Sequence, residues 1–115
     1  MTGLYNYINL ASNIKRETWG KFSELFEETS LKKGEYFIKE GELASQIGFL
    51  TKGVIRAFYR DNRGVEYNKH FFTNNNFVAG YSSLITGTPN LINQQALTDC
   101  KLFTARYKDI ELLYE

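Results

Sequence analysis

Glycines divide the chain from Leu31 onward into short segments, and this spacing restricts the fold more than any other feature of the sequence. They stand at Gly34, Gly41, Gly53 and Gly64, and the segments between them are rich in isoleucine, phenylalanine, tyrosine and valine. Short β-prone runs with a turn signal about every 8–12 residues are typical of an all-β sandwich or barrel. The sequence therefore predicts a mainly β fold.

The segments after Gly53 predict strands joined by tight turns. Residues 54–60 alternate between two faces, one with Ile55, Ala57 and Tyr59 and the other with Arg56, Phe58 and Arg60. The run Asp61-Asn62-Arg63-Gly64 has the composition of a hairpin turn in which glycine supplies a positive φ. We expect strand 65–72 to run back from it, and further strands at 77–79, 92–98 and 101–106.

Helical spacing is found on both sides of this β region. Apolar residues recur first at Leu4, Ile8 and Ala11, and after a polar break at Trp19, Phe22, Ser23 and Phe26. Inside the β region, residues 81–86 predict a single short helix that ends at Gly87 and Pro89. Residues 107–114 carry a stripe formed by Tyr107, Ile110 and Leu113.

The chain is long enough for one domain and carries no strong charge bias. With 115 residues, of which 43% are hydrophobic, it is expected to bury roughly 65% of its unfolded surface. We expect one domain, residues 1–115, with N-terminal helices in 1–30, a β-barrel in 31–106 and the start of a C-terminal helix in 107–115. A net charge of +1 gives no electrostatic footprint for nucleic acid.

Cellular location is predicted from cysteine usage and from apolar runs. Cys100 is the single cysteine, which excludes an intramolecular disulfide and fits a reducing compartment; we expect it to be a buried small residue. No apolar run reaches the 18 residues of a membrane span, and the first residues do not have the pattern of a signal peptide. We expect a cytoplasmic protein without membrane contact.

The sequence offers little for catalysis. His70 is the single histidine, whereas a metalloenzyme built on a β-barrel needs two or three histidines and a carboxylate around one metal. Nothing in the sequence places Cys100 next to His70 to form a nucleophile and base pair. We therefore expect no catalytic residue, no metal and no enzymatic activity; an enzyme on a cupin-like barrel is the weakest alternative.

The longest uncharged stretch is the most informative feature for function. No Asp, Glu, Lys or Arg occurs among the 28 residues from Phe71 to Thr98, although a 23% charged fraction predicts about six. A buried segment together with the Asn74-Asn75-Asn76 loop explains part of this absence. The other interpretations are a neutral pocket or an uncharged surface for a partner.

Two segments resemble the cyclic nucleotide-binding domain of the catabolite activator and Crp/Fnr superfamily. Residues 31–42, LKKGEYFIKEGE, are similar to the family's KKGExIxxEGE pattern, and residues 47–58 are similar to its xYxIxxGxVRxY hairpin. The order and spacing resemble most closely the Crp/Fnr-type regulators of Bacteroidetes-like bacteria. The resemblance implies a double-stranded β-helix (jelly-roll) barrel with flanking helices, in which residues 77–96 take the place of the phosphate-binding cassette.

The cassette departs from the family pattern at both charged anchors. With Phe77 aligned on the family's phenylalanine, Ala79 takes the place of glycine, Gly80 of the glutamate that holds ribose, and Tyr81 of leucine. Asn90 takes the place of the arginine that pairs with the cyclic phosphate, and Leu91 of the small residue after it. Charge-assisted hydrogen bonds contribute roughly 1.5–3 kcal/mol each, so losing two weakens binding about 10²–10⁴-fold. A micromolar site becomes one of about 100 μM or weaker.

The resemblance implies an effector-sensing regulatory domain that is not a tight cAMP or cGMP binder and needs no cofactor. Its effector would be a small molecule, and it would reach DNA only through a C-terminal domain. We expect that domain to be missing, because Glu115 falls at the family's hinge. The full-length protein is expected to be a homodimer, and this piece a monomer or weak dimer.

Two alternatives stay open within binding modules. One is a genuine cyclic nucleotide site that uses Asn90, Ser82, Ser83 and backbone N–H groups in place of the charged anchors. The other is a ligand-free interaction domain whose docking surface is the uncharged stretch 71–98.

Overall fold

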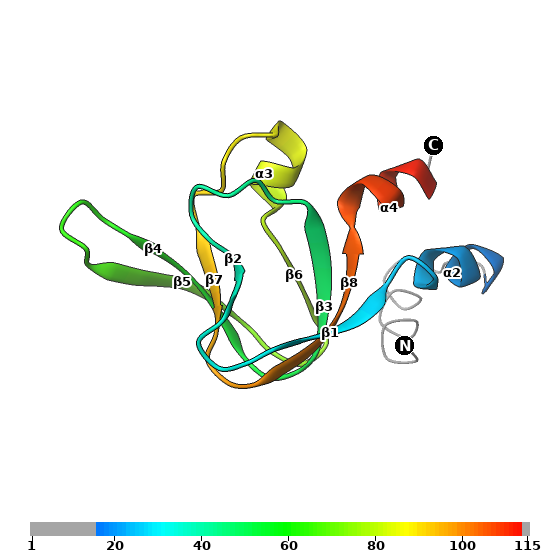
Figure 1. The fold of residues 1–115 in the computed structure, drawn as a ribbon, viewed down its shortest axis with the longest axis horizontal. Helices are drawn as coiled ribbons and strands as arrows, with labels where there is room; N and C mark the ends of the chain where they lie inside the picture. Colours follow the sequence, from blue (N-terminus) through cyan, green and yellow to red (C-terminus); the bar gives the residue numbers. More distant parts are fainter. Residues whose placement is uncertain (1–15, 114–115) are drawn as a thin grey trace.

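A computed structural model describes residues 16–113, and this part of the chain is a β-barrel with helices at one side (Figure 1). Its elements, in chain order, are α2 (Arg16–Ser23), β1 (Glu27–Leu31), β2 (Tyr36–Ile38), β3 (Gln46–Lys52), β4 (Ile55–Arg60), β5 (Glu66–Phe72), β6 (Asn76–Ala79), α3 (Tyr81–Thr86), β7 (Asn93–Ala96), β8 (Cys100–Arg106) and α4 (Tyr107–Leu113).

The strands form two four-stranded sheets. One has the order β1-β8-β3-β6 and the other β2-β7-β4-β5, and all the neighbouring pairs are antiparallel. Consecutive strands lie in different sheets at several points, so the chain winds between the two layers as in a jelly roll. The predicted fold class, a mainly β jelly-roll barrel with flanking helices, is confirmed.

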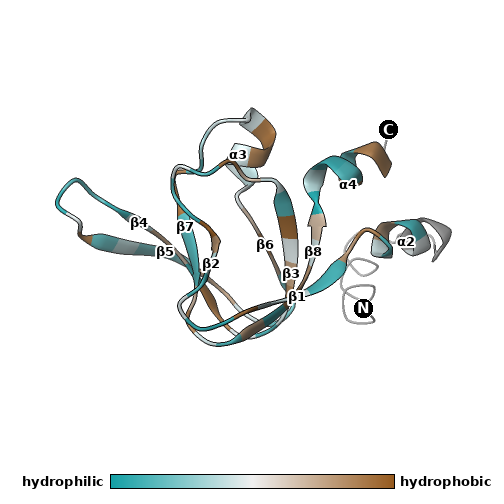
Figure 2. Ribbon diagram, in the orientation of Figure 1, coloured by the Kyte–Doolittle hydropathy of each residue, from teal (hydrophilic) through white to brown (hydrophobic). Residues whose placement is uncertain are grey.

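The barrel interior is filled from both sheets. Leu50, Ile55, Val78 and Leu102 are fully buried, and Cys100 is 3% exposed in the same cluster. They come from strands that the sequence marks by short apolar runs, and Figure 2 shows the hydrophobic colour along these strands. The prediction that Cys100 is a buried residue is confirmed.

The outer face of the β1-β8-β3-β6 sheet is covered by helices, so this sheet is buried on both sides. Phe49 is fully buried on the face opposite Leu50, and it clusters with Phe22, Phe26 and Ala105. Residues of α4 complete this second cluster. Two successive large apolar residues, Phe49 and Leu50, are the sequence signal of a strand that is buried on both faces.

The predicted start of the barrel is wrong by four residues. The helix ends at Ser23, and Glu27 already pairs with Thr104 of β8, so the barrel begins before Leu31. Phe26 lies after the helix, although its spacing from Phe22 in the sequence is helical. The two rings pack with their centroids 5.0 Å apart. The spacing of Leu4, Ile8 and Ala11 lies outside the described residues. Among residues 16–113, no helix has the length and apolar character needed to cross a bilayer.

The β4–β5 hairpin extends away from the rest of the barrel (Figure 1). Its turn is the predicted one: Gly64 has φ 83°, and the Asp61 carboxylate accepts the backbone N–H groups of Arg63 and Val65. On the face that carries the arginines, Phe58 is nonetheless fully buried. The Arg56 guanidinium lies 3.7 Å from its ring centroid and covers it, because a planar cation stacks well on an aromatic face.

Candidate functional site

The cassette segment runs from the end of β6 through α3 to the start of β7 and lies at one end of the barrel (Figure 1). Gly80 is the N-cap of α3, and Gly87 ends this helix in the left-handed conformation with φ 72°. The Gly87 N–H donates to the Ser83 carbonyl at 2.8 Å, as in a helix C-cap. The helix predicted at 81–86 is therefore confirmed with its stop signal.

Ser83 fastens α3 to the loop between β2 and β3. Its side chain is 3% exposed, and its hydroxyl accepts the Ala44 backbone N–H at 3.0 Å. The same hydroxyl donates to the Thr88 carbonyl at 2.6 Å. Both hydrogen-bonding directions of the hydroxyl are therefore used inside the protein.

Asn90 makes a second connection to the same loop. Its backbone N–H donates to the Glu42 carbonyl at 2.8 Å, and its carbonyl accepts the Gly41 N–H at 2.8 Å. The side chain is 5% exposed overall and its amide donates to the Ile92 carbonyl. Asn90 thus closes the segment after α3 on the β2–β3 loop.

Gly80 lies where a larger residue would collide with this arrangement. A Cβ atom built there would be 2.7 Å from Asn90 Oδ1 and 3.2 Å from the Ala44 Cβ. Real Cβ atoms do not approach oxygen to 2.7 Å, so any side chain at this position requires Asn90 to move. The glycine at position 80 and the position of the Asn90 side chain therefore depend on one another.

The predicted site residues fall into two groups. Ala79, Gly80, Ser83 and Asn90 are buried together, and the Ala79 carbonyl accepts the Gln94 side-chain amide at 3.0 Å. The other three residues are exposed: Tyr81, Ser82 and Leu91. The structure thus buries four of the predicted residues beside the β2–β3 loop and leaves the other three at the surface.

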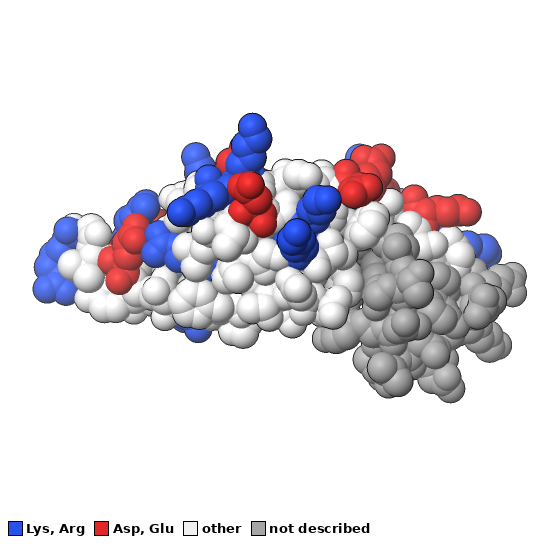
Figure 3. Space-filling model, turned by 90° about the horizontal axis from the view of Figure 1, so that it is seen from below, with Lys and Arg blue, Asp and Glu red and all other residues white. Residues whose placement is uncertain are grey.

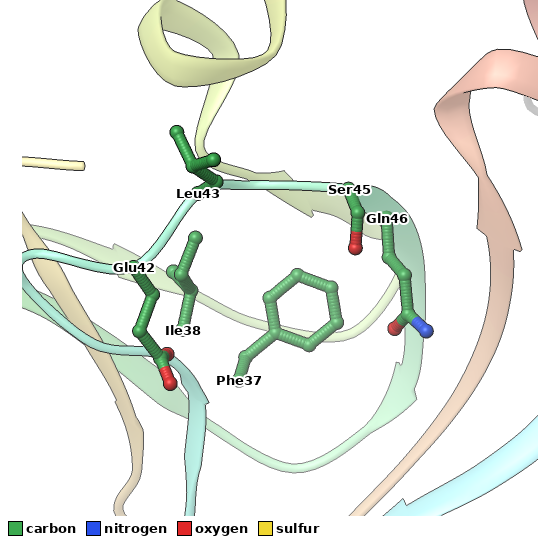
Figure 4. Close-up of a pocket in the computed structure, with 6 residues that line it drawn as sticks. All are labelled: Phe37, Ile38, Glu42, Leu43, Ser45 and Gln46. Carbon is green, nitrogen blue, oxygen red and sulfur yellow. The ribbon is translucent and has the colours of Figure 1, made fainter. Parts of the chain in front are cut away.

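A pocket lies beside the β2–β3 loop (Figure 4). It has a volume of about 260 Å³ and is lined by Phe37, Ile38, Glu42, Leu43, Ser45 and Gln46. The Glu42 carboxylate accepts the Lys39 backbone N–H at 2.7 Å and is thereby fixed as part of the loop. None of these lining residues belongs to the predicted cassette set, so the sequence did not indicate this pocket.

Two buried amides of β7 are further functional candidates that the sequence reasoning missed. Asn93 and Gln94 are each 4% exposed, and within the described residues Asn93 Nδ2 and Gln94 Oε1 have no hydrogen-bond partner. The orientation of each amide is fixed, because Asn93 Oδ1 accepts the Glu40 N–H and Gln94 Nε2 donates to the Ala79 carbonyl. The signal was the polar run Asn-Gln-Gln in a strand otherwise expected to be apolar.

The charged network of the domain lies on the hairpin. Glu66 bonds Arg56 at 3.0 Å and Arg60 at 2.8 Å, and hydrogen bonds from Arg60 and then Arg56 lower the pKa of its carboxyl. A hydrogen bond from Arg63 lowers the pKa of Asp61 in the same way. His70 is exposed on β5, and no metal-binding group of three His, Cys, Asp or Glu occurs in the described part of the chain.

These features decide the family once they are compared with known proteins. The sequence profile described as "cyclic nucleotide-binding domain" matches residues 28–115, which begin at β1 and include both sheets. The chain belongs to the cyclic nucleotide-binding domain family. The predicted family is thereby confirmed, whereas the altered chemistry of the cassette and the Bacteroidetes-like variant stay predictions. A comparison with curated protein sequences gives no match.

Solved structures of the family share the fold at low sequence identity. The catabolite activator protein of Thermus thermophilus is 18% identical, with a TM-score of 0.78 over 89% of this chain and 47% of its own. The sensor domain of the transcriptional regulator DNR from Pseudomonas aeruginosa is 17% identical, with a TM-score of 0.79 over 97% of this chain and 71% of its own.

A protein kinase A regulatory subunit gives a similar result. The cAMP-independent subunit from Trypanosoma cruzi, bound to guanosine, is 17% identical, with a TM-score of 0.85 over 98% of this chain and 39% of its own. This chain thus spans about half of the catabolite activator protein, and less of the kinase subunit.

Proposed function

We propose that this chain is the effector-sensing domain of a Crp/Fnr-type transcription regulator and that it does not bind cAMP or cGMP tightly. The observation that carries the proposal is the internal use of the cassette's polar groups. Ser83 and Asn90 bond the chain itself, and Gly80 leaves no room for the family's carboxylate. The likeness to the catabolite activator protein and to the DNR sensor domain supports the regulatory role.

Two effects disfavour a cyclic phosphate in the cassette: the absence of cationic side chains from it, and the hydrogen bonds that its polar groups already make. A cyclic phosphate entering the cassette would meet no cationic side chain from the cassette itself, since residues 71–98 contain no Lys or Arg. To bind the ligand, Ser83 and Asn90 would first have to break their present hydrogen bonds. The loss of two charge-assisted hydrogen bonds alone weakens binding by about 3–6 kcal/mol.

The buried amide of Gln94 supports an uncharged effector in place of a cyclic phosphate. Within the described residues its Oε1 atom accepts no hydrogen bond, and an unpaired buried acceptor costs roughly 1–3 kcal/mol. A small molecule with an N–H or O–H group that reached this atom would recover that cost. An anion would be repelled by the same oxygen.

The mechanism that we propose is regulatory and not catalytic. Occupancy of the barrel changes the contacts of the cassette with the β2–β3 loop, and this change is passed to a C-terminal helix that follows α4. DNA binding then belongs to another domain of a homodimeric, cytoplasmic full-length protein. No cofactor takes part in this mechanism.

Calorimetry with cAMP and with cGMP tests the proposal. We expect dissociation constants no tighter than about 100 μM, which is the consequence of a 10²–10⁴-fold loss from a micromolar site. The double variant Gly80→Glu with Asn90→Arg should bind either nucleotide more tightly, because the arginine replaces the asparagine that blocks a side chain at position 80. Low-micromolar binding by the unmodified chain would contradict the proposal.

The second candidate is a ligand-free interaction domain. Exposed apolar side chains within residues 71–98 favour it, with Ile85 74% and Leu91 75% exposed beside Tyr81 at 47%. A protein partner with an apolar face would cover these residues. The two functions differ in thermal unfolding, because a small-molecule effector raises the Tm of a sensing domain and an interaction domain of this kind has none.

A further inference from the structure

The end of the barrel opposite α3 is rich in lysine (Figure 1). Lys32 and Lys33 lie in the turn between β1 and β2, Lys52 ends β3, and Lys101 is near the start of β8. The turns and strand ends that meet there contain two acidic residues, Glu35 and Asp99, and a Glu35 carboxylate oxygen accepts the Lys32 backbone N–H at 2.6 Å. Figure 3 looks at this end and shows Lys and Arg side chains over the middle of the face, with Asp and Glu side chains between them.

The strand register places two of these lysines directly opposite one another. Lys101 pairs with Lys52 on one side and with Ser30 on the other, so the three residues form one row across β1, β8 and β3. Like charges on directly opposite positions destabilise a sheet. Neighbouring strands are about 4.7–4.9 Å apart, which brings the two ammonium groups within reach of a single small ligand.

These lysines have no anionic partner in the part of the chain that the structure describes. The ion pairs of residues 16–113 join other side chains and lie on the hairpin and at Arg106. Asp99 uses one carboxylate oxygen to accept the Lys33 backbone N–H at 2.9 Å. Within the described residues, neither Lys52 nor Lys101 is therefore neutralised by an ion pair.

A cavity of about 350 Å³ lies among these side chains. Its rim carries Lys32, Lys52, Lys101, Ser30 and Asp99, and its apolar wall is formed by Leu31 and Cys100. Three lysines against one aspartate leave two positive charges in the cavity without a counter-charge. A volume of this size is in the range of small-ligand sites.

The backbone around the cavity is held in place by hydrogen bonds between turns. The Gly53 N–H donates to Asn74 Oδ1 at 3.0 Å, and the Val54 N–H donates to Thr98 Oγ1 at 3.1 Å. Thr51 Oγ1 donates to the Lys101 carbonyl at 2.9 Å. The positions from which Lys52 and Lys101 extend are therefore fixed before any ligand binds, which lowers the cost of binding.

We propose that this cavity binds a small anion with several phosphate charges. Ammonium groups bind phosphate oxygens by charge-assisted hydrogen bonds, and a multiply charged anion can contact Lys52 and Lys101 together. The Ser30 hydroxyl, in the same row, donates a further hydrogen bond. This site is distinct from the cassette and does not depend on the proposed sensing function.

An NMR titration of the ¹⁵N-labelled protein with pyrophosphate tests the proposal, with sodium chloride adjusted to keep the ionic strength constant. We expect saturable shifts of the amides around residues 30–33, 52–53 and 99–101, and a rise in Tm of a few degrees at saturation. A second arm with ATP distinguishes free polyphosphate from a nucleotide. Equal affinity assigns binding to the phosphates, and tighter ATP binding adds a contact of the base with Leu31 and Cys100.

Matched charge variants decide whether the lysine row is responsible. Lys52→Gln with Lys101→Gln should weaken pyrophosphate binding at least tenfold, with no loss of stability, because this change also removes the repulsion. The control variant Lys21→Gln with Lys108→Gln removes the same charge from α2 and α4 and should bind as the unmodified chain does. Shifts that do not saturate, that centre on residues 79–91, or that fall equally in both variants would overturn the proposal.

Discussion

The two ends of the barrel differ in how they use polar groups. At the cassette end, the chain carries no charge from Phe71 to Thr98, and Ser83 and Asn90 are bonded to the chain itself. At the opposite end, Lys32, Lys52 and Lys101 surround a cavity and have no anionic partner among the described residues. At the cassette end, the buried polar side chains of Ser83 and Asn90 already have partners in the chain. At the opposite end, the lysine ammonium groups around the cavity are available to a ligand.

We infer from this difference that the fold of the domain and the chemistry of its cassette segment can vary separately. The cyclic nucleotide-binding fold keeps its cassette because α3 and its loop pack against β2 and β3, with Gly80 and Asn90 closely fitted. That packing requires no charged side chain. The lysines to which we assign phosphate binding are brought together where three strands and two turns meet.

The largest expected effect on the free energy of unfolding comes from adding a methyl group at a closely packed glycine of each end. A Cβ at Gly53 would lie 2.6 Å from Cys100 Sγ and 2.8 Å from the Asp99 carbonyl, and φ is 117°. Strain and overpacking together predict that Gly53→Ala lowers the free energy of unfolding by about 2–5 kcal/mol. Gly80→Ala meets the end of one side chain and should cost about 1–3 kcal/mol. Urea unfolding measures both.

Gly64→Ala is the control for the backbone effect. Gly64 also has a positive φ, 83°, but a Cβ there meets nothing within 4 Å. We expect a loss of about 1 kcal/mol, from the backbone conformation alone. Equal losses at Gly53 and Gly64 would show that the close contact with Cys100 has no energetic weight.

The next effect tests whether the cassette's polar groups stabilise the fold. Ser83→Ala removes the acceptor of the Ala44 N–H and the donor to the Thr88 carbonyl, and should lower the free energy of unfolding by about 1–3 kcal/mol. Ser82→Ala, at an exposed position of the same helix, should change it by less than about 0.5 kcal/mol. Urea unfolding of the two variants checks this, and a neutral Ser83→Ala would mean that the hydroxyl is available to a ligand.

A smaller effect of opposite sign is expected at the lysine end. Lys52→Gln removes the repulsion from Lys101 across the sheet and should raise the free energy of unfolding by about 0.2–1 kcal/mol at low salt. The gain should shrink as sodium chloride is added, because salt screens exposed charges. A Lys52→Gln protein that is less stable at low salt would show that Lys52 has a stabilising partner.

The smallest effect lies outside both ends, on the β4–β5 hairpin. The pKa of Glu66 lies below its ordinary value of 4.5 because Arg60 and then Arg56 donate hydrogen bonds to it. A lowered pKa adds stability that is present above pH 4.5 and is lost as the pH falls through the folded value. Glu66→Gln should therefore flatten the acid side of the stability–pH profile slightly, whereas Glu111→Gln on α4 should leave it unchanged. Identical profiles for both variants would show that the hairpin network does not contribute to the pH dependence of stability.

The sequence predicted the barrel well because its strand and turn signals are local. The turn at Asp61–Gly64, the short helix at 81–86 and its stop at Gly87 depend on neighbouring residues and are confirmed. The predicted start of the barrel was wrong because β1 is recognised only through its pairing with β8, whose Phe103 lies 75 residues after its partner Glu28. Long-range pairing leaves no local mark in a run such as Glu-Glu-Thr-Ser.

The candidate site was only partly predictable for the same reason. The missing charges at Gly80 and Asn90 could be read from the sequence, but not the contact between them or the bonds from Asn90 to the β2–β3 loop. The lysine cavity is assembled from three separate parts of the chain. Its members, Lys32, Lys52 and Lys101, become neighbours only through strand register.

We infer that the cassette keeps its fold but does not bind the cyclic phosphate. An NMR titration of the ¹⁵N-labelled chain with cAMP, at constant ionic strength, measures this directly at Gly80, Ser83 and Asn90. We predict that these amides do not shift in a saturable way below about 100 μM cAMP. Saturable shifts centred on them at low-micromolar cAMP would contradict the account.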